Sequence, residues 1–66
     1  MKRRALERWL RRHRAVFHHH GSSHDVWWTA SGSGGQFASV PRHREIKPNT
    51  ARAICDQLRV PRPPGL

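Results

Sequence analysis

His24 is the residue of this chain best suited to proton transfer. It lies in the segment Gly21-Ser22-Ser23-His24-Asp25-Val26-Trp27-Trp28, where a small-residue turn precedes residues typical of a β-strand. A histidine changes charge near neutral pH, and a turn joined to a strand would hold it at an accessible rim. Ser23 and Asp25 flank His24 and could orient the ring or its turn. A lone histidine beside glycine and serine is also a common solvated loop residue, so this hypothesis needs support from elsewhere in the chain.

The charge of the chain indicates a polyanionic partner. It has 13 Lys and Arg against 4 Asp and Glu, a formal net charge of +9, and all of the basic residues except Lys2 and Lys47 are Arg. Because the planar guanidinium group matches phosphate, this composition favours nucleic acid over an acidic protein or an anionic membrane. The residues that we expect to bind RNA are Arg42 first, then His43, Lys47, Arg8, Arg11 and Arg12.

The length of 66 residues allows one domain with a thin core, because so short a chain buries only about 60% of its unfolded surface. We expect the domain to span residues 1–60 and a Pro-rich, disordered tail to span residues 61–66. Cys55 is the one cysteine, so an internal disulfide is excluded, and no apolar stretch approaches the roughly 20 residues of a membrane span. We therefore expect a cytoplasmic protein.

Hydrophobic spacing predicts a helix at each end. From Lys2 to His13 the apolar residues Leu6, Trp9 and Leu10 recur at i, i+3 and i+4 and leave the arginines on the outer surface. After Pro48, with Asn49 or Thr50 as the cap, a second helix would bury a set of residues at i, i+3, i+4 and i+7, namely Ala51, Ile54, Cys55 and Leu58.

The middle of the chain predicts a three-stranded meander. Strands are expected at 14–20, 24–30 and 36–40, joined by the turn 21–23 and the glycine-rich loop 31–35. The fold class is therefore α+β, in the order α-β-β-β-α, with a three-stranded antiparallel sheet and two helices on one face. Alternation in the second strand puts Trp27 and Trp28 on opposite faces. One should pack under the helices and the other should stack on a base or a partner; we assign Trp27 to the RNA-binding surface.

Cleavage of RNA by its own 2′-hydroxyl fits these features best. It needs a proton shuttle and positive charge on the developing phosphorane, but no deep pocket and no metal ion or other cofactor. His43 is a candidate for a second proton-transfer group, with a plain loop histidine as the alternative. His18 and His20 share a strand face and could chelate zinc, but the chain has no cysteine pair and no recognisable metal-site spacing.

Two motifs resemble the HicA family of toxins. One is Gly21-Ser22-Ser23-His24-Asp25-Val26-Trp27, and the other is Val40-Pro41-Arg42-His43-Arg44-Glu45-Ile46 followed by Thr50-Ala51-Arg52-Ala53-Ile54. The similarity runs from about Leu6 to Leu58. The chain departs from the family at two places: Ser22 stands where many members have glycine before Ser-His, and Arg14 stands near the end of the first helix, where many have glycine.

The resemblance implies a double-stranded-RNA-binding-like fold and the toxin half of a type II toxin–antitoxin pair. It also implies ribosome-independent cleavage of mRNA, with His24 as the catalytic residue, and a HicB-type antitoxin that covers the active face. We expect a metal-independent endoribonuclease that does not bind DNA or membrane. The alternative is a non-catalytic RNA-binding module of the same fold.

Overall fold

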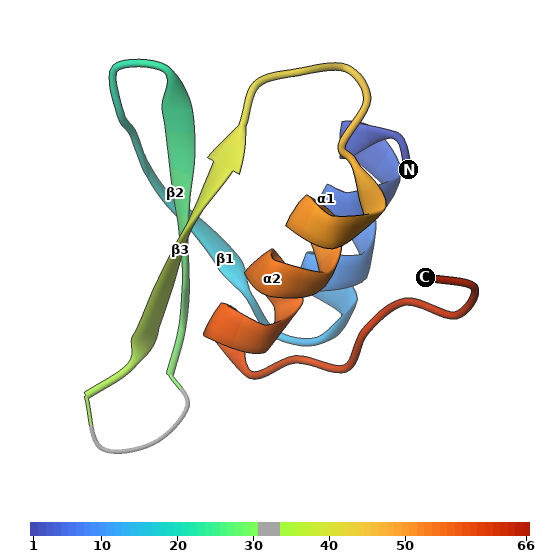
Figure 1. Ribbon diagram of the computed structural model, residues 1–66. Coiled ribbons are helices and arrows are strands. Elements are labelled where there is room, and N and C mark those ends of the chain that lie inside the picture. The colour runs from blue at the N-terminus through green and yellow to red at the C-terminus, as the bar shows by residue number, and fades with distance from the viewer. Residues whose placement is uncertain (31–33) are drawn as a thin grey trace.

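The computed structural model describes residues 1–30 and 34–66. Its elements follow the predicted order, with helix α1 (Arg3–Arg12), strands β1 (Val16–His20), β2 (His24–Thr29) and β3 (Gln36–Pro41), and helix α2 (Pro48–Leu58) (Figure 1). The α+β class and the α-β-β-β-α order are confirmed. The predicted loop 31–35 falls outside the described residues except for Gly34 and Gly35.

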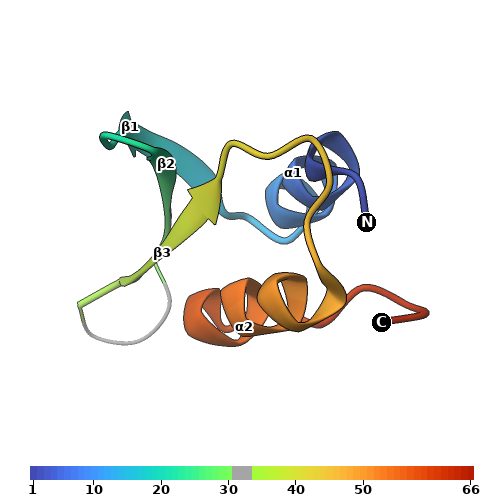
Figure 2. The same ribbon diagram turned by 45° about the horizontal axis from the view of Figure 1, so that its top comes forward.

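The sheet is antiparallel throughout and has the strand order β1-β2-β3. Both helices lie on one of its faces and leave the other face uncovered (Figures 1 and 2). In β2, Asp25, Trp27 and Thr29 point to the helices, because side chains alternate along a strand. His24, Val26 and Trp28 therefore belong to the opposite surface, which we call the open face.

One hydrophobic cluster joins the helices to the sheet. The sheet contributes Trp27, Ala38 and Val40, which are at most 4% exposed, and the helices contribute the apolar positions expected from their spacing, Leu6, Leu10, Ala51, Ile54, Cys55 and Leu58. The Thr29 hydroxyl is also buried and donates a hydrogen bond to the Leu58 carbonyl oxygen at 2.9 Å. The core thus fixes which face of β2 meets the helices.

The start of α2 differs from the prediction of an Asn49 or Thr50 cap. The helix begins at Pro48, the capping position is Lys47, and no side chain caps the first turn. Proline suits the first helical position because its ring presets the backbone angle and its missing N–H would have no partner there. The predicted cap was therefore two to three residues too late in the chain.

Both helices end in the same backbone motif, with an arginine in the left-handed conformation. Arg14 has φ 70° after α1, and Arg59 has φ 57° after α2. The next residue bonds back into the helix each time, Ala15 N–H to the Leu10 carbonyl at 2.9 Å and Val60 N–H to the Cys55 carbonyl at 3.0 Å. This is the Schellman arrangement, which usually takes glycine at the left-handed position. Arg14 thus adopts the conformation that a glycine near this helix end would favour.

The C-terminal tail folds back on the domain, contrary to the expectation of a disordered segment. Pro63 is buried, and Leu66 packs against the core cluster. The Trp9 indole N–H donates a hydrogen bond to the Pro61 carbonyl at 2.6 Å, and Arg62 forms an ion pair with Asp56 at 2.7 Å. Prolines end α2 as expected, but apolar and polar contacts then hold the chain that follows it.

In the described part of the chain, residues 1–30 and 34–66, no helix is both long enough and apolar enough to cross a membrane.

Replacing Arg14 by glycine should stabilise the domain. A residue with a Cβ in the left-handed conformation costs roughly 1–2 kcal/mol, and glycine removes this cost. Because glycine also has more conformational freedom in the unfolded chain, part of this stabilisation is lost. We therefore expect the free energy of unfolding to rise by about 0.5–1 kcal/mol. Urea unfolding followed by Trp fluorescence measures the free energy of unfolding. The matched control is Arg8→Gly, an exposed position inside α1, which should destabilise by about 1 kcal/mol. A loss of stability in both variants would contradict the proposed backbone strain at Arg14.

Candidate active site

The β1–β2 turn presents His24 at the edge of the sheet. Gly21 N–H donates a hydrogen bond to the His24 carbonyl oxygen at 2.7 Å and closes the turn around Ser22 and Ser23. A Cβ at residue 21 would lie 2.9 Å from that same oxygen, so the close approach requires glycine. With the glycine at position 21, Ser22 is accommodated within the turn. His24 itself is exposed and lies opposite Pro41 of β3.

Ser23 orients the imidazole of His24. The Ser23 hydroxyl and His24 Nδ1 lie 3.0 Å apart, within hydrogen-bond distance. This contact occupies one ring nitrogen and leaves Nε2 as the nitrogen available to a ligand. The role expected of Ser23 from the sequence, orienting the histidine, agrees with this contact.

Arg42 follows the last residue of β3 and holds the β1–β2 turn by hydrogen bonds from its guanidinium group, which we call the clamp. Its Nε donates to Asp25 Oδ1 at 2.9 Å, and its terminal nitrogens donate to the carbonyl oxygens of Gly21 at 2.7 Å and of Ser22 at 3.3 Å. The His24 carbonyl lies 3.4 Å from the same guanidinium. We expected Arg42 to hold substrate phosphate, but the structure directs its guanidinium to the protein's own turn.

The Asp25 carboxylate bonds Arg42 and the neighbouring His20, whereas the hydrogen-bond partner of the His24 ring is Ser23. His20 Nδ1 lies 2.8 Å from Asp25 Oδ1, the same oxygen that Arg42 contacts. These contacts, the hydrogen bond to His20 first and then the one to Arg42, hold the pKa of the Asp25 carboxyl below its ordinary value. Asp25 therefore orients the turn through Arg42.

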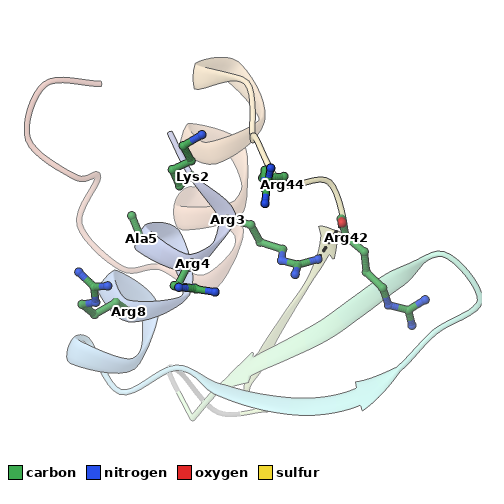
Figure 3. A pocket seen from close by; sticks show the side chains of 7 residues that line it. All are labelled: Lys2, Arg3, Arg4, Ala5, Arg8, Arg42 and Arg44. Carbon is green, nitrogen blue, oxygen red and sulfur yellow. Dashed lines mark hydrogen bonds between the residues drawn. The ribbon is translucent and has the colours of Figure 1, made fainter.

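A basic groove runs from α1 to the end of β3 (Figure 3). All 13 basic residues of the chain lie in residues 2–14 or 42–62, which we call the two basic segments. The groove has a volume of about 650 Å³ and is lined by residues from both of them, namely Lys2, Arg3, Arg4, Ala5, Arg8, Arg42 and Arg44. Two hydrogen bonds join the segments: Arg3 Nη1 donates to the Arg42 carbonyl at 2.7 Å, and Arg3 N–H donates to the Arg44 carbonyl at 2.9 Å. The two basic segments, far apart in sequence, are thus neighbours in space.

The other expected RNA-binding residues are spread over three places. Arg8 lines the basic groove, whereas His43 and Lys47 line a separate hollow at the start of α2. Arg11 lies over the Trp27 ring, with its guanidinium carbon 5.0 Å from the ring centroid, and Arg12 is exposed at the last residue of α1. Only Arg8 and Arg42 therefore share the groove.

The assignment of Trp27 to the RNA-binding surface was wrong. Trp27 is 1% exposed and belongs to the core, where the edge of its ring meets Phe17. The strand alternation was predicted correctly, but Trp28, not Trp27, is the residue on the open face.

The sequence placed Arg3 and Arg4 on the basic outer surface of the first helix, which could be a solvated face or a track for phosphates, but neither they nor Arg44 were among the expected binding residues. The signal available was their place in the two basic segments, which also contain residues that point elsewhere. Only the hydrogen bonds between Arg3 and the β3–α2 connection show which arginines line one groove.

Loss of the clamp should loosen the turn without unfolding the domain. In Arg42→Gln, the backbone order parameters of residues 21–24 should fall from values near 0.85 toward about 0.6, while those of α2 stay unchanged. Arg44→Gln, which removes a charge from the same connection but no contact to the turn, is the control. Equal order in both variants would contradict the clamp.

The clamp should also depend on pH. The pKa of Asp25 is lowered in the folded state. The stabilisation that its ionised carboxylate gives the turn is therefore complete above the ordinary pKa of about 3.9, and it is lost as the pH falls through the lowered pKa. The order parameters of residues 21–24 should decrease over that range in the native protein and show no such transition in Asp25→Asn. A transition that persists in Asp25→Asn would assign it to another group.

Comparison with known proteins supports one family. Residues 3–60 match the family described as "HicA toxin of bacterial toxin-antitoxin". No curated protein and no solved structure gives a significant match. The match includes the turn that carries His24, the clamp, and all residues that line the basic groove except Lys2. Because it spans most of the 66 residues, this chain belongs to the HicA toxin family of bacterial toxin–antitoxin systems.

Proposed function

We propose that this HicA-family chain is an endoribonuclease that cleaves mRNA independently of the ribosome and of metal ions, with His24 as the proton-transfer group. The observation that carries the proposal is the placement of an exposed histidine, oriented by Ser23, on a clamped turn beside a basic groove. A proton shuttle and nearby cationic charge are what phosphodiester cleavage by a neighbouring 2′-hydroxyl requires.

The proposed reaction is a transesterification. His24 Nε2 accepts the proton of the 2′-hydroxyl, and the 2′-oxygen forms a bond to the adjacent phosphorus. The bond from phosphorus to the 5′-oxygen breaks, and that oxygen takes a proton from the imidazolium or from water. The products are a 2′,3′-cyclic phosphate and a 5′-hydroxyl end, with no net oxidation or reduction.

The basic groove would hold the phosphates next to the reacting one. Arg4, Arg8 and Arg44 are exposed there, and their guanidinium groups have no hydrogen bond or ion pair among the described residues 1–30 and 34–66. Arg3 already bonds the Arg42 carbonyl, and the Arg42 guanidinium bonds the turn. We therefore assign phosphate binding to Arg4, Arg8 and Arg44, and a positioning role to Arg42.

The off state would come from a HicB-type antitoxin in the cytoplasm. No element among the described residues 1–30 and 34–66 covers the exposed His24, and a surface of net charge +9 would speed capture of an acidic partner. Such a partner should compete with RNA for the surface around His24 and restore growth on co-expression. RNA cleavage that continues in the complex would show that the partner acts elsewhere.

Replacement of His24 by alanine should abolish RNA cleavage while the fold survives, because an exposed histidine contributes chemistry and no core packing. The expected loss is on the order of 10²- to 10⁴-fold in cleavage rate, measured with purified protein and mRNA in excess chelator. Ser23→Ala should show a smaller loss because it leaves the imidazole in place but less well oriented.

His19→Ala is the matched control, since His19 is an exposed histidine on the open face opposite Val26. It should cleave at close to the normal rate. Near-normal cleavage by folded His24→Ala would remove His24 from the mechanism, and loss of native activity in chelator would contradict the metal-free reaction. RNA binding without cleavage by the native protein would support the binding-module alternative.

The groove predicts a steep salt dependence of RNA binding. Each phosphate contact contributes about 0.7 to the slope of log K against log salt for single strands. The triple variant Arg4→Gln, Arg8→Gln and Arg44→Gln should therefore flatten the slope by about 2.

A triple variant of equal charge, Arg52→Gln, Arg59→Gln and Arg62→Gln, serves as the control because these residues lie on or after α2 and outside the groove. If both triple variants change the slope equally, only the total charge matters and the groove is not the RNA site.

A further inference from the structure

The open face of the sheet carries an aromatic pair, of which Phe37 is exposed and Trp28 is half-buried. Trp28 of β2 lies opposite Phe37 of β3, with ring centroids 6.4 Å apart, and Phe37 is 52% exposed. Val16 of β1 lies on the other side of Trp28 and is 49% exposed. A solvated sheet face normally carries polar side chains, so a row of exposed apolar ones indicates a binding surface.

A third ring joins this pair from the edge strand. The pairing of β1 with β2 is irregular between Phe17 and His19, and a bulge of this kind redirects the side chain within it. The ring of His18 lies edge-on to Phe37, with centroids 5.2 Å apart and an interplanar angle of 81°. His18, Trp28 and Phe37 together form a surface that we call the aromatic platform.

Gly35 holds the indole of the platform in place. A Cβ at this position would lie 2.3 Å from Trp28 Nε1, and Gly35 has φ +75°, a conformation that favours glycine. The loop backbone therefore packs directly against the indole. This contact presets the Trp28 ring, which reduces the conformational entropy that a ligand would have to offset.

The charges around the platform suit a polyanion. All four carboxylate residues of the chain lie away from the open face or in ion pairs with basic groups, Glu7 with Arg3, Asp25 with Arg42, Glu45 with Lys2 and Asp56 with Arg62. No acidic side chain alternates onto the open face of β2 or β3. The face is thus apolar and aromatic but free of the negative charge that would repel phosphates.

The platform and His24 lie on the same side of the sheet. Trp28 lies four positions after His24 along β2, roughly 13 Å away at about 3.3 Å per residue. An RNA strand whose reacting phosphate sits at His24 would pass over the platform with a nearby nucleotide. Stacking of a base on aromatic rings needs the base to be free of its duplex partner, because paired bases are already stacked.

We propose that the aromatic platform binds an unpaired base of the RNA by stacking, so that the substrate is a single-stranded segment and not a duplex. This inference rests on the proposed ribonuclease function and adds the class of RNA on which it acts. A protein partner on the same face is the competing occupant, and the experiment separates the two.

The test measures binding with the full chain carrying His24→Ala, so that cleavage does not interfere. The probes are a labelled unstructured RNA of about 12 nucleotides and the same RNA in a duplex. Adding Phe37→Ala should weaken binding of the single strand about 5- to 150-fold and leave duplex binding unchanged. Phe37→Trp should restore single-strand binding, because it replaces the aromatic surface.

Ser39→Ala is the matched control, since Ser39 is exposed on the same face of β3 as Phe37 but is neither apolar nor aromatic; it should bind both RNAs normally. The stacking proposal would be overturned if Phe37→Ala left single-strand binding unchanged, or if it weakened binding of the single strand and of the duplex to the same extent. Loss of antitoxin binding alone would also overturn it and would make the face a protein interface.

The same measurements distinguish this inference from the proposed function. If the chain with His24 intact binds the single strand through Phe37 but does not cleave it, base stacking on the platform is supported and the proposed ribonuclease function is contradicted. If the native chain cleaves single strands, and the Phe37→Ala variant cleaves and binds them equally well, the proposed ribonuclease function is supported and base stacking on the platform is contradicted.

Discussion

The hydrogen bonds from Arg42 to the β1–β2 turn are the constraint on which the proposed site depends. One guanidinium ties the end of β3 to Asp25 and to the carbonyl oxygens of the turn that carries His24. Its five N–H donors in a fixed plane suit this arrangement, which a lysine could not reproduce. Because the Arg42 backbone carbonyl also accepts a bond from Arg3, the clamp connects the turn to the basic groove.

This arrangement divides the work between two surfaces of a very small domain. The basic groove on the helix side would bind phosphates without regard to sequence, whereas the open face would contact a base next to the reacting phosphate. The two surfaces meet at the turn, where His24 lies beside Pro41 and Arg42 follows directly in the chain. A domain with a thin core can therefore present a proton-transfer group and two binding surfaces without a deep pocket.

The sequence predicted the elements and their order because hydrophobic spacing is strong in both helices and turn residues separate the strands. It also predicted that Trp27 and Trp28 face opposite sides, since alternation is a local property of a strand. Which side meets the helices depends on distant partners such as Ala38 and Val40, so Trp27 was assigned to the wrong surface. The proximity of the two basic segments depends on tertiary contacts in the same way, because Arg3 bonds the carbonyl oxygens of Arg42 and Arg44.

Other features depend on contacts that residue types do not reveal. A count of arginines does not tell whether a guanidinium points to a ligand or to its own chain, and Arg42 does the latter. Arg14 takes a conformation typical of glycine because burial of Ala15 and its bond to Leu10 outweigh the local cost. The tail also looked disordered from its prolines, but Leu66 reaches the core.

The central claim, that His24 activates a 2′-hydroxyl of the RNA, is tested most directly with a substrate in which one nucleotide at a mapped cleavage site lacks that hydroxyl. The account predicts that this RNA binds with unchanged affinity and is not cleaved at the modified position, while neighbouring sites are cut as before. Cleavage at the 2′-deoxy position at the normal rate would contradict the account, because the attacking group would then have to come from water or from the protein.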